Sequence, residues 1–105
     1  MAPQPTPLDF SKYQIRIING SGIAGEASRA RQLVVDNGFS VEGVGNSDSF
    51  DFTSAQITHK EQVEEGYIDR LREFLEQRYE TEVLSGEVDN EEEFDVLIIV
   101  GSSLK

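Results

Sequence analysis

The sequence lacks cysteine, is poor in basic residues and has no long apolar run. Without cysteine there is no disulfide, no thiolate metal site and no cysteine nucleophile, although the redox compartment stays open. The longest apolar run is Val96 to Val100, whereas a membrane span needs about 20 apolar residues. No basic stretch precedes an apolar one, as it would in a signal peptide. We therefore expect no direct membrane insertion by this segment.

Nine lysines and arginines stand against 20 aspartates and glutamates, which gives a net charge of -11 at pH 7. Such a field repels polyanions. Nucleic acid is therefore not expected as a partner, and anionic lipids or wall polymers are disfavoured unless divalent cations bridge the like charges. The same charge keeps a small domain soluble, and it also suits an acidic protein-protein interaction domain.

All three prolines fall at positions 3, 5 and 7, among small and polar residues. This composition favours an extended segment that packs poorly. Residues 1–12 are therefore predicted to form a flexible linker, which leads us to expect tethering to an upstream anchor or catalytic domain. Residues 13–105 are predicted to form one domain, because the length allows a single modest core.

Strand and helix patterns alternate along this domain. Period-two alternation or a continuous apolar run predicts five strands, at 13–19, 39–44, 54–60, 81–84 and 95–100. Apolar spacing of three and four predicts two helices, at 23–37 and 63–79. Gly38 suits a left-handed cap after the first helix, and Gly43 and Gly45 are expected to end the second strand. The fold class is thus α/β, a single mixed β-sheet of about five strands with two helices in the order β-α-β-β-α-β-β.

Two placements of the helices are open. Both can cover one face of the sheet, or one helix can lie on each face in three layers. The last strand is apolar at every position from Val96 to Val100, which is typical of a sheet centre covered on both sides. This strand favours the three-layer arrangement, or a closely covered central strand.

A glycine-rich turn, Asn19 to Gly25, follows the first strand. Gly20, Gly22 and Gly25 fit G-x-G-x-x-G, and Glu42 stands about 20 residues further on, as in a dinucleotide-binding turn. A dinucleotide fold, however, needs more parallel strands than the remaining chain supplies. A small nucleotide-binding domain is the less favoured alternative, and glycines that let a helix pack closely on a strand are the favoured one.

Four segments resemble the LytR C-terminal domain family: Ile17 to Gly25, Asn37 to Val41, Val44 to Asp48 and Asp95 to Ser102. The resemblance implies a non-catalytic accessory domain of LytR-CpsA-Psr cell-envelope proteins. It further implies an extracytoplasmic place in a bacterial cell envelope, on a parent protein anchored in the membrane, with peptidoglycan or other envelope proteins as partners. The acidic insert at 87–93 departs from the family's pattern.

Three polar segments follow strands whose carboxyl ends should meet at one edge of the sheet, where open α/β sheets bind ligands. Their amides and hydroxyls suit sugar hydroxyls or a peptide backbone better than phosphate. We therefore expect a shallow ligand-binding groove lined by Asn19, Gly20, Ser21, Gly22, Asn46, Asp48, Ser102 and Ser103. The alternative is that Asn19 and Asn46 are turn and cap residues whose side chains satisfy backbone groups.

The sequence offers no catalytic constellation. Ser21 lacks the second spacing of a nucleophile elbow and has no evident partner base. His59, the only histidine, is expected to be partly buried and structural. The acidic run from Glu87 to Asp95 lacks the spacing of an EF-hand and should form a solvated loop with at most weak cation binding. We expect no enzyme activity, no metal site and no cofactor.

Overall fold

Residues 12–47, 52–89 and 91–102 are described by a computed structural model. The elements in chain order are β1 (Gln14–Asn19), α1 (Glu26–Val35), β2 (Ser40–Asn46), β3 (Ala55–His59), α2 (Glu65–Leu75), β4 (Thr81–Glu87) and β5 (Val96–Val100). One five-stranded sheet holds all the strands. The predicted α/β class and element order are confirmed.

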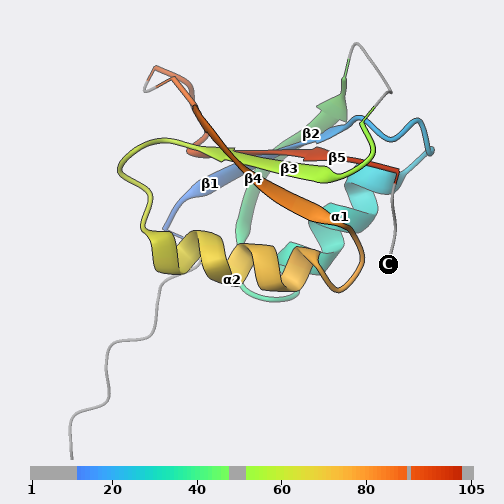
Figure 1. Cartoon of the computed structure of the whole chain (residues 1–105), viewed down its shortest axis with the longest axis horizontal. Helices are drawn as coiled ribbons and strands as arrows, with labels where there is room; N and C mark the ends of the chain where they lie inside the picture. Colours follow the sequence, from blue (N-terminus) through green and yellow to red (C-terminus); the bar gives the residue numbers. More distant parts are fainter. Residues whose placement is uncertain (1–11, 48–51, 90, 103–105) are drawn as a thin grey trace, which may run out of the picture.

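The strands lie in the order β2-β1-β5-β3-β4 (Figure 1). β1 pairs in parallel with both β2 and β5, whereas β3 pairs antiparallel with β5 and parallel with β4. The sheet is therefore mixed, as predicted, and β5 is its central strand. The carboxyl ends of β1, β2 and β5 meet at one edge.

Both helices pack on one face of the sheet, so the molecule has two layers (Figure 1). Alternate strand residues such as Ile17 and Ile98 are buried there in a single core with Val34 of α1 and Leu71 of α2. The favoured three-layer arrangement is therefore wrong. On the second face of β5, Leu97 and Ile99 are half-buried, and Phe94 and Val88 lie around the same hollow as Leu97.

The predicted start of α1 and the predicted end of β2 were wrong, each at a glycine. Gly22 and Gly25 have φ of 78° and 79°, which no helix accommodates, so α1 begins at Glu26 and Ile23 lies in the turn. Gly38, with φ of 95°, ends the turn after α1 as predicted. β2 does not stop at its glycines, because pairing with β1 continues to Asn46.

Candidate binding edge and neighbouring ion cluster

Asn19 and Ser21 hold the glycine-rich turn together. Asn19 Oδ1 accepts hydrogen bonds from the Ser21 backbone N–H (3.0 Å) and hydroxyl (2.6 Å), and Asn19 Nδ2 donates to the Ile23 carbonyl (2.8 Å). Ser21 Oγ in turn accepts from the Ile23 N–H at 3.0 Å. Both side chains are buried, at 5% and 8% exposure. The polar groups of this motif therefore serve the turn itself.

Backbone hydrogen bonds in this turn argue against dinucleotide binding. The Gly20 N–H donates to the Val100 carbonyl (2.9 Å), and the N–H groups of Ser21 and Ile23 are taken by the motif's own side chains. A Cβ on Gly20 would stand 2.4 Å from Cδ2 of the Phe52 ring. Gly20 thus permits close packing, and three backbone donors of the glycine-rich turn already pair within the protein.

A hollow of about 250 Å³ opens beside the turn, between β2 and the first turn of α1. We call it the edge hollow; it is lined by Asn19, Gly25, Ala27, Ser28, Val44, Gly45 and Asn46. Asn19 and Asn46 are register partners at the ends of β1 and β2, so the sheet brings two predicted site residues together. None of the lining residues is ionisable, although the chain carries a net charge of -11.

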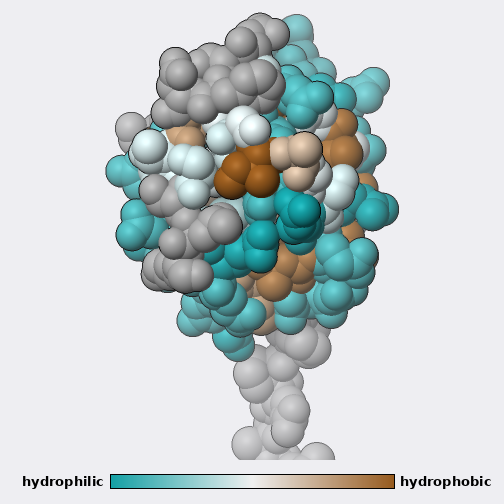
Figure 2. Space-filling view, turned by 90° about the vertical axis from the view of Figure 1, so that its right-hand side faces the viewer, coloured by the Kyte–Doolittle hydropathy of each residue, from teal (hydrophilic) through white to brown (hydrophobic). Residues whose placement is uncertain are grey.

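Gly20, Ser21, Gly22 and Ser102 do not line the edge hollow, although Gly20 and Ser102 both pair with the backbone of Phe52. Gly22 lies in the turn, and Ser102 is exposed and donates its N–H to the Phe52 carbonyl (3.0 Å) without lining the edge hollow. Asp48 and Ser103 lie outside the described residues. Figure 2 looks onto the edge where β1, β2 and β5 end, and shows hydrophilic side chains interrupted by several hydrophobic areas.

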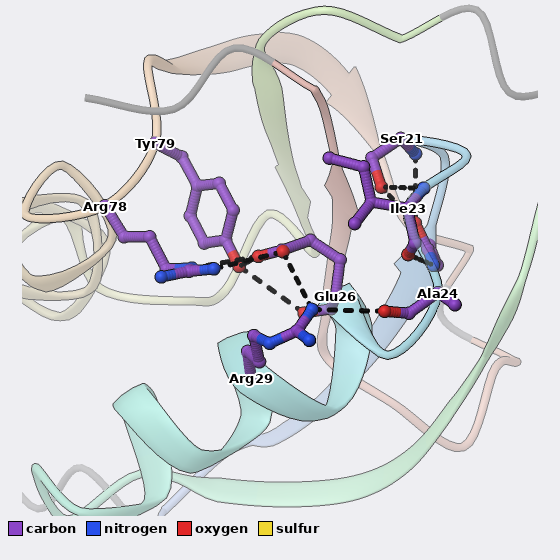
Figure 3. Close-up of polar contacts among 8 residues, drawn as sticks. Ser21, Ile23, Ala24, Glu26, Arg29, Arg78 and Tyr79 are labelled. Carbon is purple, nitrogen blue, oxygen red and sulfur yellow. Dashed lines mark hydrogen bonds and ion pairs between the residues drawn. The ribbon is translucent and has the colours of Figure 1, made fainter.

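Glu26, at the first position of α1, is a buried carboxylate that the sequence analysis missed. It is 1% exposed and accepts hydrogen bonds from Arg78 Nε (2.9 Å) and Nη2 (3.1 Å) and from the Tyr79 hydroxyl. Arg29 Nη1 lies 3.2 Å from Glu26 Oε1. Figure 3 shows these groups converging from α1 and from the segment after α2. No local pattern links positions 26 and 78, so only the tertiary fold shows the cluster.

The contacts within this cluster determine the protonation states of Glu26 and Tyr79. Hydrogen bonds from Arg78 outweigh the desolvation of burial and hold the pKa of Glu26 below its usual value. Burial, together with the hydrogen bond to Glu26, raises the pKa of the Tyr79 hydroxyl. At pH 7 a carboxylate, two guanidiniums and a neutral phenol therefore face one another.

His59 is the last residue of β3, and Lys60, which follows it, anchors the segment before β5. His59 is half-buried, as expected, with Nδ1 2.8 Å from the Lys60 carbonyl oxygen. Lys60 is 6% exposed, and its Nζ donates to the Glu92 carbonyl (2.8 Å) and lies 3.4 Å from Asp95 Oδ1. The acidic side chains of 91–93 are exposed as predicted, but their backbone is fastened by this lysine.

A second hollow, of about 390 Å³, lies on the sheet face that carries no helix. It is lined by Arg16, Ile18, Thr58, Val88, Asp89, Glu92, Phe94 and Leu97. Arg16 pairs with Glu42 at 3.0 Å and lies over the Phe94 ring, 5.2 Å from its centroid. An apolar floor with acidic residues on its rim is therefore open to solvent.

Neither a membrane-crossing helix nor a group of three or more metal-binding side chains occurs within 12–47, 52–89 and 91–102.

Residues 12–103 match the family described as "LytR cell envelope-related transcriptional attenuator" (LytR_C). No curated protein matches the chain. The solution structure of the C-terminal domain of RV0431 is 24% identical, with a TM-score of 0.56 over 96% of this chain and 83% of that one. The crystal structure of the soluble domain of a conserved hypothetical secreted protein from Mycobacterium marinum, an Rv2700 ortholog, is 18% identical. Its TM-score is 0.61 over 95% of this chain and 68% of that one, and both likenesses show the fold.

Proposed function

The chain belongs to the LytR C-terminal domain family, an accessory domain family of cell-envelope proteins, and on that premise we propose that it binds peptidoglycan-type glycan or peptide outside the cytoplasm. In this role it catalyses nothing and positions an attached catalytic or anchoring module against the wall. The family match supports the envelope setting, and the Mycobacterium marinum neighbour is described as secreted.

The observation that carries this proposal is the uncharged edge hollow. Asn46 and Ser28 are exposed there and offer an amide and a hydroxyl, the groups that hydrogen-bond sugar hydroxyls and peptide backbones. The hollow also lies where open α/β sheets bind ligands, beyond the carboxyl ends of parallel strands. A neutral ligand or a short peptide meets no ionised lining residue there.

Calorimetric titration with soluble peptidoglycan fragments tests the proposal. We expect Asn46→Ala and Ser28→Ala each to weaken binding about fivefold to tenfold, the value of one lost hydrogen bond. Gln62→Ala is the matched control, because Gln62 carries an exposed side-chain amide at the opposite edge. Its backbone carbonyl, which the substitution leaves in place, accepts a hydrogen bond from the Tyr13 hydroxyl. Unchanged affinity in both hollow variants, or no binding by the wild type, contradicts the proposal.

A second candidate, an acidic protein-protein interaction domain, is favoured by the open sheet face. Its apolar floor and acidic rim suit an apolar partner segment flanked by basic residues. Thr58→Arg places a bulky cation in that hollow and should abolish retention of envelope proteins, while Asn46→Ala should not. The reverse pattern, or retention of envelope proteins by neither wild type nor variant, rejects this candidate.

A further inference from the structure

Arg29 and Arg78 border a third hollow, of about 430 Å³, on the helix side of the molecule. We call it the arginine hollow; its lining residues are Arg29, Gln32, Leu33, Asp36, Gln77 and Arg78. The Arg29 and Arg78 side chains are 52% and 38% exposed. Both guanidiniums therefore reach solvent as well as the buried carboxylate.

The two guanidiniums are neighbours because they share one oxygen. Glu26 Oε1 lies 3.2 Å from Arg29 Nη1 and 3.1 Å from Arg78 Nη2. Each guanidinium has five N–H donors. Within the described residues, hydrogen bonds occupy only Nη1 of Arg29 and Nε and Nη2 of Arg78. Donors on both side chains are thus left for another acceptor.

The charges around the arginine hollow favour an acceptor with a single negative charge. Two positive groups meet one negative group at Glu26, which leaves one positive charge in excess at this end. Asp36, which accepts from Gln32 Nε2 at 2.7 Å, lies seven residues along α1 from Arg29, or about 10 Å by helix geometry. A single carboxylate is attracted at the arginine end, and an extended polyanion is repelled at the other.

We propose that the arginine hollow binds the terminal carboxylate of a peptide whose last residue has an apolar side chain. Arg29 and Arg78 hold the carboxylate through charge-assisted hydrogen bonds, and Leu33 between the charged ends contacts the apolar side chain. The proposal does not rest on the edge hollow, which lies on a different face of α1. A protein C-terminus and a wall peptide ending in a D-residue share this chemistry.

Amide and side-chain NMR titrations of the full chain at constant ionic strength test this assignment. The probes are N-acetyl-L-alanine, N-acetyl-D-alanine, the methyl ester of N-acetyl-L-alanine and inorganic phosphate. We expect saturable shifts at the Arg29 and Arg78 Nε–H groups with one or both acids and none with the ester. Preference for the L form indicates a protein terminus, and preference for the D form a wall peptide; equal binding supports the carboxylate site without chiral selection.

Arg29→Gln should weaken binding of the preferred acid about tenfold or more, since it removes charged donors. Arg70→Gln is the control: it removes the same charge from the exposed face of α2, where Arg70 pairs with Glu73 at 3.0 Å. Arg78 is not substituted, because it also donates two hydrogen bonds to the buried Glu26 carboxylate. The assignment is overturned by the absence of saturable shifts with both acids, by equal affinity in Arg29→Gln and wild type, or by phosphate or ester binding as tightly as the acids.

Discussion

Glu26 is a single carboxylate that joins α1 to the segment after α2. Burying a charge is tolerated only when hydrogen bonds and opposite charge replace its hydration. Here Arg78 supplies a two-nitrogen contact and Tyr79 a hydroxyl donor, while Arg29 completes the shell from the next turn of α1. Glu26 therefore has a structural role, which the sequence does not reveal because Glu26 is one of 20 acidic residues.

Replacing this carboxylate tests that role. Glu26→Gln keeps the shape but leaves the Arg78 guanidinium without its counter-charge, so we expect the free energy of unfolding to fall by about 2 kcal/mol in urea denaturation. Glu73→Gln removes an exposed partner of Arg70 and should change it by less than about 0.5 kcal/mol. Equal effects of the two substitutions would show that the buried cluster does not stabilise the fold.

Acidification probes the same group. The pKa of Glu26 is lowered in the folded chain, so its contribution is fully present above its unfolded pKa of about 4.3 and is lost as pH falls through the folded pKa. Between about pH 6 and about pH 3, the free energy of unfolding should therefore fall more steeply for wild type than for Glu26→Gln. Parallel curves in denaturation series at several pH values would contradict the assignment.

Among the elements, the turn after β1 shows where sequence patterns succeed and where they stop. The strand, the Gly38 cap and the meeting of Asn19 with Asn46 follow from patterning and parallel pairing, and all three could be predicted. The start of α1 could not, because Ile23 keeps the helical spacing while Gly22 and Gly25 hold positive φ. The Glu26 cluster depends on a contact between residues 52 apart, which no local pattern specifies.

Two glycines of the sheet region differ in how tightly their surroundings are packed. A Cβ on Gly101, after β5, would lie 2.3 Å from the Thr53 carbonyl oxygen, whereas a Cβ on Gly43 of β2 meets nothing within 4 Å. Gly101→Ala should lower the free energy of unfolding by about 2 kcal/mol. Gly43→Ala should raise it by about 0.5 kcal/mol, because alanine loses less backbone entropy in a strand. Thermal denaturation of both variants checks the contrast, and a neutral Gly101→Ala would refute the close packing.

At the scale of the whole molecule, two helices cover one face of the sheet and leave the other to short segments. The continuous apolar run of β5 predicted cover on both sides, and the structure supplies a helix layer on only one. Sequence alone cannot separate a central strand buried by helices from one whose second face is half-buried, as Leu97 and Ile99 are. The acidic residues on the rim of this face are part of the net charge of -11, whereas the edge hollow has no ionisable lining residue.

Amide shift mapping with soluble peptidoglycan fragments tests most directly whether the edge hollow is a wall-binding site. We expect saturable shifts at Ser28, Gly45 and Asn46, with Thr58 on the open face and Gln62 at the opposite edge unmoved. Shifts confined to residues outside the edge hollow, or no saturable shift at all, would contradict wall binding at this edge.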